Sequence, residues 1–80
     1  MRLDKFLKVS RIIKRRSVAN EVCDAKKIKV NNVTSKASYN VKIGDIIEIS
    51  IGNKITKIKV LQINEHTTKE SASNNYMIIE

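Results

Sequence analysis

The spacing of apolar residues changes once along this 80-residue chain, close to Lys26. Before that point Leu3, Phe6 and Leu7 recur three and four residues apart, which places them on one face of a helix. After it, polar and apolar residues alternate, as they do in a half-buried strand. The sequence therefore predicts an α+β fold, in which two N-terminal helices pack on a small antiparallel β-sheet.

The first helix is expected over residues 3–9 and the second over residues 17–25, with a short turn between them. Ser17 is the expected N-cap of the second helix, because its hydroxyl can accept a backbone N–H of the first turn. Four side chains of the second helix form two pairs spaced four residues apart and are expected to face the core. They are Val18 with Val22, and Ala19 with Cys23.

Strands are expected where the alternating pattern is bounded by residues that form turns. Asn31-Asn32 is expected to form a tight turn, because asparagine tolerates a positive φ better than most residues. Gly44-Asp45 and Gly52-Asn53 mark two further turns, and residues 64–75 are expected to form a polar loop. The expected strands cover residues 27–30, 33–34, 46–51, 54–63 and 76–79.

Positive charge is concentrated in the first sixteen residues. They hold seven basic residues and one acidic residue, in a chain whose formal net charge is +8. All four arginines of the chain lie there, and a planar guanidinium group can bind phosphate oxygens through two parallel hydrogen bonds. An ordinary solvated helix face is the simpler explanation of a basic cluster. The one-sided excess and the position of the arginines favour a phosphate-binding surface instead.

The expected RNA-binding residues follow from this cluster. Asp4 is included as a group that orients a basic side chain, since a carboxylate in direct contact would repel phosphate. Lys26, Lys27 and Lys29 are weaker candidates, because cations after a helix also complement the negative end of its dipole. The primary candidates are Arg2, Asp4, Lys5, Lys8, Arg11, Lys14, Arg15 and Arg16.

No catalytic or metal-binding cluster is recognisable in the sequence, so no enzyme activity, metal or cofactor is expected. Cys23 is the single cysteine and is expected to be a core residue in a reducing cytoplasm. His66 lies in a polar segment and is expected to be exposed. No apolar run is long enough to span a membrane, and no secretion signal is found. We expect a monomeric cytoplasmic protein with a single domain over residues 1–80.

Three classes of partner would suit the charge. The chain has only three aromatic residues, so platforms that stack single-stranded bases are not expected and structured RNA is favoured. DNA binding by a helix-turn-helix is an alternative, although the early change from helices to strands argues against it. An acidic protein or a membrane surface is a further alternative, but the chain lacks the long amphipathic helix that a membrane surface favours.

Four separate segments resemble the RNA-binding domain named after small-subunit ribosomal protein four, also called the alpha-L RNA-binding motif. The resemblance covers about residues 2–51, and a hairpin and tail over residues 52–80 lie beyond it. The four segments are Arg2-Leu3-Asp4-Lys5-Phe6-Leu7, Lys14-Arg15-Arg16-Ser17-Val18-Ala19, Ile28-Lys29-Val30-Asn31 and Val41-Lys42-Ile43-Gly44-Asp45-Ile46-Ile47.

The resemblance also implies a function. A stand-alone domain of this kind is similar to ribosome-associated heat-shock protein fifteen and, more closely, to the P component of bacterial ribosome-associated quality control. It implies binding to large-subunit ribosomal RNA and peptidyl-tRNA on stalled, split 50S subunits, and assistance to the factor that adds C-terminal alanine tails. A general ribosome recycling or heat-shock factor without a tailing role is the alternative. Arg2, Lys5 and Arg16 would be the leading contacts.

The chain departs from the family pattern at a few positions. The family usually has glycine where this chain has Lys26 and Asn32, and it often has proline at the position of Ile43. Asn32 can adopt a left-handed conformation at small cost. Lys26 in that conformation would cost about 1 kcal/mol, so the turn after the second helix is expected to differ locally.

Overall fold

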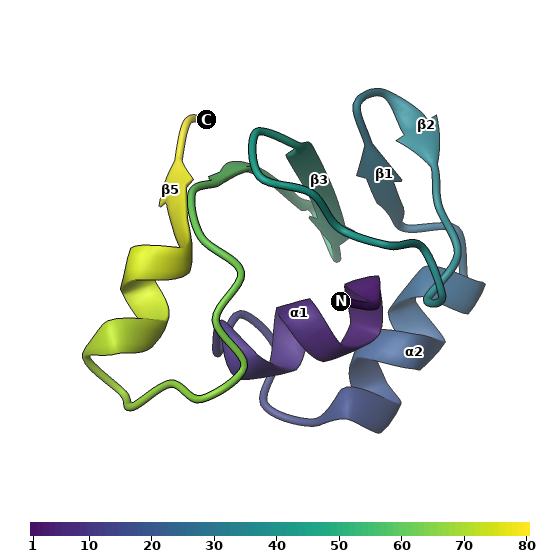
Figure 1. Ribbon diagram of the computed structural model, residues 1–80. Coiled ribbons are helices and arrows are strands. Elements are labelled where there is room, and N and C mark those ends of the chain that lie inside the picture. The colour runs from purple at the N-terminus through teal and green to yellow at the C-terminus, as the bar shows by residue number, and fades with distance from the viewer.

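Two helices cover one face of a five-stranded antiparallel sheet in the computed structural model, which describes residues 1–80 (Figure 1). Helix α1 covers Leu3–Val9 and helix α2 covers Arg16–Asp24. The strands lie in the order β2-β1-β3-β4-β5, so the predicted α+β architecture is confirmed. Their bounds are Ile28–Val30 for β1, Val33–Thr34 for β2, Ile46–Ile51 for β3, Lys54–Val60 for β4 and Tyr76–Ile78 for β5.

Helix α1 has the predicted bounds, whereas α2 begins earlier than predicted. Arg15 occupies the N-cap position of α2 in an extended conformation, and no side chain caps the helix. Ser17 therefore lies inside the first turn, and its predicted role as the N-cap is wrong. A capping hydroxyl contributes only about 1 kcal/mol, so the docking of α2 on α1 and the sheet can move the start of the helix.

Both helices end with a basic residue in the left-handed conformation. Arg11 has a φ of 58° after α1, and Lys26 has a φ of 62° after α2. The backbone N–H of Lys26 donates to the Cys23 carbonyl at 2.9 Å, and that of Lys27 donates to the Val22 carbonyl at 3.2 Å. These two bonds define the Schellman motif, in which glycine is the usual residue. The turn after α2 thus takes the glycine-type conformation, and the expected local difference at Lys26 is not found.

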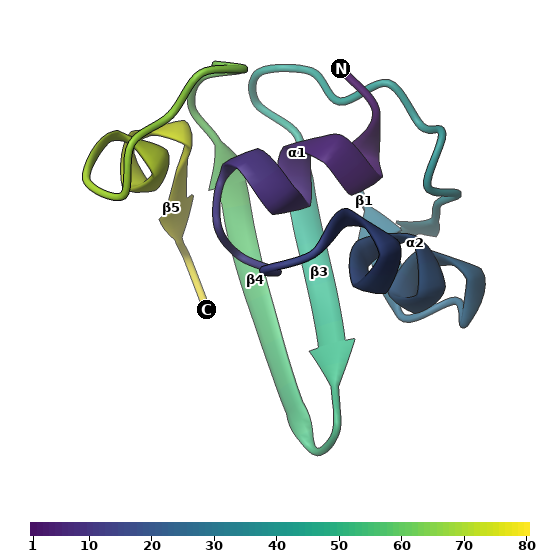
Figure 2. The ribbon, with the colours of Figure 1, turned by 90° about the horizontal axis from the view of Figure 1, so that it is seen from below.

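The strand connections follow the predicted turns. Asn31 and Asn32 both have positive φ values, 52° and 69°, as the two central residues of a type I′ hairpin turn require. Gly52 has a φ of 60° between β3 and β4, and the tip of that hairpin projects beyond the helices (Figure 2). Strand β4 ends at Val60 instead of residue 63, because the N–H groups of the next two residues donate to the Asn75 carbonyl.

The core lies between the helices and the inner face of the sheet. Leu3, Phe6 and Leu7 are fully buried, as the three-four spacing predicted. Ala19 and Cys23 of α2 are also buried, as predicted. Val18 was predicted to face the core as well, but this prediction is wrong, because the residue is 39% exposed. From the sheet, the main buried side chains are Ile28, Val30, Ile47, Ile49, Ile58 and Val60. None of the helices is long and apolar enough to cross a membrane.

The C-terminal segment returns to α1 before it joins the sheet. The segment predicted as a loop contains a short 3-10 helix, η1, over Ser71–Asn75. Asn75 and Ser10 are both buried, and the Asn75 side-chain amide donates to the Ser10 hydroxyl at 3.1 Å. Residues 65 positions apart are therefore held together at the C-terminal end of α1.

Candidate nucleic-acid interface

The buried carboxylate of Asp4 holds two arginines that come from different helices. Asp4 is 2% exposed. Arg2 Nε lies 3.2 Å from Asp4 Oδ1, and Arg16 Nε lies 3.4 Å from Asp4 Oδ2. The arginine side chains remain about half exposed, at 51% and 47%. The predicted orienting role of Asp4 thus has a geometric basis, since one carboxylate fixes both guanidinium groups at the surface.

Four donors compensate for the burial of Asp4. Burial by itself would raise the pKa of this carboxyl group, because it disfavours the charged form. Hydrogen bonds from the Asn20 amide, the two arginines and the Lys5 backbone N–H outweigh burial and hold the pKa below its ordinary value of 3.8. Asp4 therefore stays ionised at neutral pH. No sequence pattern predicted the participation of Asn20, which lies on α2.

Lys5 has a partner that the sequence did not predict. Its ammonium group lies 2.7 Å from Glu65 Oε1, in the segment that follows β4. The hydrogen bond and the charge of Lys5 lower the pKa of Glu65. Lys5 is thus engaged with the C-terminal segment in the free protein, while Arg2 and Arg16 are engaged with Asp4.

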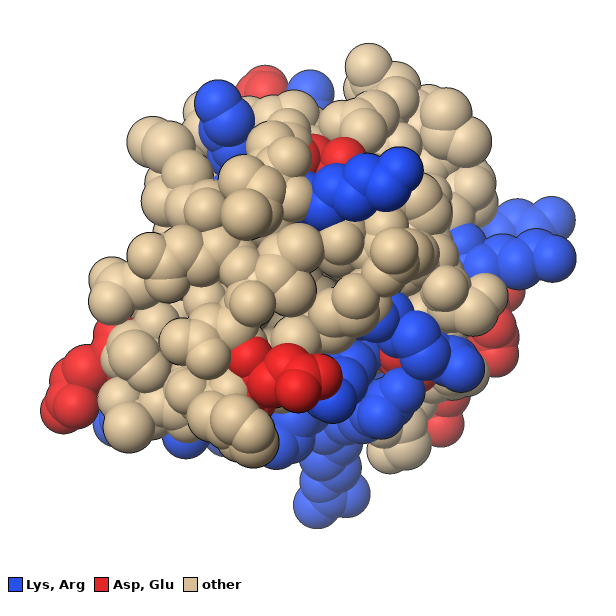
Figure 3. Space-filling view, viewed as in Figure 1, with Lys and Arg blue, Asp and Glu red and all other residues tan.

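The remaining basic residues of the N-terminal cluster form no ion pair. In the view of Figure 3, lysine and arginine side chains gather in the lower part of the molecule, where α1 and α2 lie. Arg15 precedes α2 and is exposed. Lys8, Arg11 and Lys14 are also exposed and line one groove of about 810 Å³. They lie on the last turn of α1 and on the connection to α2.

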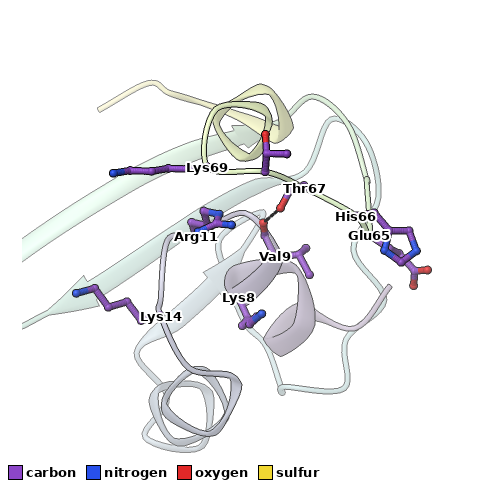
Figure 4. Close-up of a pocket in the computed structure, with 9 residues that line it drawn as sticks. Lys8, Val9, Arg11, Lys14, Glu65, His66, Thr67 and Lys69 are labelled. Atoms are coloured by element: carbon purple, nitrogen blue, oxygen red, sulfur yellow. Dashed lines mark hydrogen bonds between the residues drawn. The ribbon is translucent and has the colours of Figure 1, made fainter.

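Residues 65–69, which were predicted only as part of a polar loop, form the opposite wall of this groove. Figure 4 shows Lys69 and Lys14 extending toward the same side of the groove, with Arg11 between the two chain segments. The Thr67 hydroxyl donates to the Val9 carbonyl at the end of α1. His66 is exposed, as predicted, and it also lines the groove. Only the fold could reveal this arrangement, because the two walls are more than fifty residues apart in the sequence.

The weaker candidates Lys26 and Lys29 lie on different parts of the surface. Lys26 lines a second groove together with Arg2 and Lys36, next to α2. Lys27 follows in the turn before β1. Lys29 lies between two buried residues of β1 and pairs in register with Glu48, so its side chain is on the sheet face opposite the helices. Lys29 thus lies outside the groove that Lys26 lines.

A second buried carboxylate, Asp45, organises the turn before β3. It accepts hydrogen bonds from the Lys42 backbone N–H, the Tyr39 hydroxyl and the Asn31 amide, at 2.9, 2.9 and 3.0 Å. Burial acts to raise the pKa of Asp45, but these donors outweigh it and leave the pKa lowered from 3.8. Because Asn31 lies in the β1–β2 turn, Asp45 ties two distant connections together.

Cys23 is buried in the core, as predicted. Burial and the nearby carboxylates Asp4 and Asp24 raise the pKa of its thiol to about 11. The thiol is therefore protonated at neutral pH and is a small apolar group that packs α2 on the sheet.

The sequence of this chain is similar to a known domain family and to proteins from several bacteria. Residues 1–47 match the S4 domain, and this match includes all eight primary candidate residues. The chain is 54% identical over 79 residues to the "RQC P-site tRNA stabilizing factor" of Streptococcus pneumoniae, covering 99% of this chain and 90% of that protein. The protein of the same name from Bacillus subtilis is 48% identical over 80 residues, covering 100% of this chain and 93% of its own length.

The chain belongs to the S4 domain family, within the group of RQC P-site tRNA stabilizing factors. A more distant relative is the heat shock protein 15 homolog of Haemophilus influenzae, 32% identical over 81% of this chain and 50% of that protein. The solved structure of heat shock protein 15 from Vibrio cholerae superposes with a TM-score of 0.91 at 29% identity, covering 99% of this chain and 81% of the other. The S4 match ends within β3, so β4, η1 and β5 lie beyond it.

Proposed function

We propose that this chain is a non-catalytic RNA-binding factor of ribosome-associated quality control. In this role it binds large-subunit ribosomal RNA and peptidyl-tRNA on stalled, split 50S subunits and assists the factor that adds C-terminal alanine tails. The observation that carries the proposal is the likeness, over almost the whole chain, to proteins named RQC P-site tRNA stabilizing factors. The paired, exposed guanidinium groups of Arg2 and Arg16 supply the chemistry that such binding needs.

The electrostatics of the N-terminal surface support recognition of RNA through its backbone. Arg2 and Arg16 reach the surface from a fixed buried anchor, which reduces the entropy lost when they bind phosphate. Lys8, Arg11, Lys14 and Arg15 add positive charge without ion pairs of their own. If about five phosphates of duplex RNA are contacted, the slope of log K against log salt concentration should be near −4 to −5. A slope near zero would contradict electrostatic docking.

The decisive experiment is to recover the tagged full-length chain from cells and to identify the ribosomal particle that comes with it. The proposal predicts large subunits that carry peptidyl-tRNA. The variant with both Arg2→Ala and Arg16→Ala should lose these particles, whereas Lys54→Ala, at the exposed tip of the β3–β4 hairpin, should retain them. Recovery of small subunits or of intact ribosomes instead would contradict the proposal.

A second candidate function is a general ribosome recycling or heat-shock factor without a role in tailing. The likeness to heat shock protein 15 from Vibrio cholerae over 99% of this chain favours it. The two functions differ in one measurable product, the alanine tail on stalled nascent chains. Deletion of the gene should shorten or abolish tails under the first proposal and leave them unchanged under the second.

We further propose that the chain acts as a cytoplasmic monomer.

A further inference from the structure

We propose that the groove between the end of α1 and residues 65–69 is an RNA-backbone site, with Lys69 as a contact residue that lies outside the S4 match. The proposal rests on the RNA-binding function above and extends it to a part of the chain beyond the S4 domain. The groove is lined by Lys8, Val9, Arg11, Lys14, Glu65, His66, Thr67, Thr68 and Lys69.

The charge of the groove suits a polyanion. Four cationic side chains line it from two chain segments, and none of the four is paired with a carboxylate in the structure. The only acidic residue of the lining is Glu65, and its carboxylate is engaged by Lys5 at 2.7 Å. Unpaired cations that line one groove repel one another, and this repulsion is relieved when phosphate groups bind between them.

Hydrogen bonds hold both walls of the groove in place. One wall is held by Thr67, whose hydroxyl donates to the Val9 carbonyl at the end of α1. The same segment is fixed further along by the buried contact of Asn75 with Ser10. The opposite wall is fixed by a Schellman turn at Arg11, where the Arg11 N–H donates to the Lys8 carbonyl and the Ile12 N–H to the Leu7 carbonyl, both at 3.0 Å. Arg11 has a φ of 58° in this turn. Both walls are therefore positioned before any ligand binds.

The lining favours RNA over an acidic protein. Val9 is its only apolar residue, and no phenylalanine, tyrosine or tryptophan lines it. Protein interfaces usually bury an apolar or aromatic centre, which is missing from this groove. Phosphate backbones are bound instead by lysine, arginine and threonine side chains, which make up most of the lining. A groove of about 810 Å³ is also larger than a single small ion needs.

Paired charge variants test the groove in the full-length chain. Lys69→Ala and Lys69→Glu are compared with Lys54→Ala and Lys54→Glu, which change the net charge equally at the distant hairpin tip. The probe is a preparation of split 50S subunits carrying peptidyl-tRNA, with co-sedimentation as the readout at several salt concentrations. We expect Lys69→Ala to weaken binding about three- to tenfold and to reduce the salt slope by about 1. We expect Lys69→Glu to weaken it further, while the Lys54 variants bind like the unmodified chain. Lys69 is exposed, so the thermal unfolding of its variants should be unchanged.

A photoreactive side chain at position 66, within the groove, identifies what is bound there. Cross-links to RNA support the proposal, whereas cross-links to a ribosomal protein alone, or to nothing, overturn it. Equal binding by the Lys69→Glu and Lys54→Glu variants also overturns it.

The variant Arg16→Ala separates this inference from the proposed function. Loss of binding with Arg16→Ala but not with Lys69→Glu refutes the groove alone, and failure of the unmodified chain to bind the subunits refutes both.

Discussion

Arg16, at the start of α2, lies 3.4 Å from the buried carboxylate of Asp4, in the first turn of α1. The same carboxylate holds Arg2, whose guanidinium group donates to both of its oxygens. An acidic residue thus sits under the surface that is proposed to bind a polyanion. Asp4 is 2% exposed and is covered by the two guanidinium groups that it orients. Its negative charge is therefore shielded from a phosphate that binds to these groups.

Asp4→Asn tests whether orientation or net charge matters more. The change adds one unit of positive charge to the chain, so attraction alone would strengthen binding to RNA. We expect the affinity for tRNA to fall about two- to tenfold, because both arginines lose a charged anchor. Glu21→Gln adds the same charge at an exposed position on α2 and serves as the control in a fluorescence anisotropy titration. Equal or tighter binding by Asp4→Asn would show that the anchor is unimportant.

Arg16→Lys tests whether the shape of the guanidinium group is required. Lysine keeps the charge but cannot form two parallel hydrogen bonds to one phosphate. Arg16→Ala should lower the affinity about tenfold, and Arg16→Lys should restore only part of the loss. The melting temperature should change by less than about 8 °C, because the Arg16 side chain is half exposed and Asp4 keeps Arg2 and Asn20 as partners, so that we expect a loss under about 1 kcal/mol. Global unfolding of Arg16→Ala would instead identify a structural residue.

The stability of the fold should decrease in acid because of Asp4 and Asp45. Both carboxyl groups have folded-state pKa values below 3.8, so each favours the folded state when ionised. Their contribution is fully present above the unfolded pKa of about 3.9 and is lost as the pH falls through the lower folded values. Urea unfolding measured between about pH 6 and about pH 2 should show this decline. Asp45→Asn should lower stability at pH 6 and reduce the decline, and an unchanged pH profile would contradict the role of Asp45.

Lys26→Gly should stabilise the protein. Lys26 has a φ of 62°, a conformation that costs a side-chain-bearing residue about 1 kcal/mol and costs glycine little. For a chain of this length we expect a rise in melting temperature of about 4–8 °C, measured by circular dichroism. Lys27→Gly removes the same charge at the next position, where φ is not positive, and should lower the melting temperature. A fall with Lys26→Gly would mean that its side chain makes a stabilising contact.

Local sequence patterns determined the elements and most of the turns. The spacing of Leu3, Phe6 and Leu7 predicted α1 with its observed bounds, because helical periodicity depends only on near neighbours. The preference of asparagine for positive φ predicted the turn at Asn31-Asn32 for the same reason. Ser17 shows where local preference stops, since the docking of α2 moved the helix start to Arg16.

The pairing of charges was decided by the tertiary structure. Sequence composition identified the basic N-terminal segment, but it could not show that Asn20 and Arg16 meet at Asp4 or that Lys5 is engaged by Glu65. It also could not assign Lys69 to the groove beside Lys14, since these residues are 55 positions apart. Such contacts depend on how helices, sheet and C-terminal segment pack together, and short-range periodicity carries no record of that packing. The sequence alone thus predicted an N-terminal set of RNA contacts, whereas the fold decided that Arg2 and Arg16 share the Asp4 anchor and that Lys69 joins Lys8, Arg11 and Lys14 in one groove.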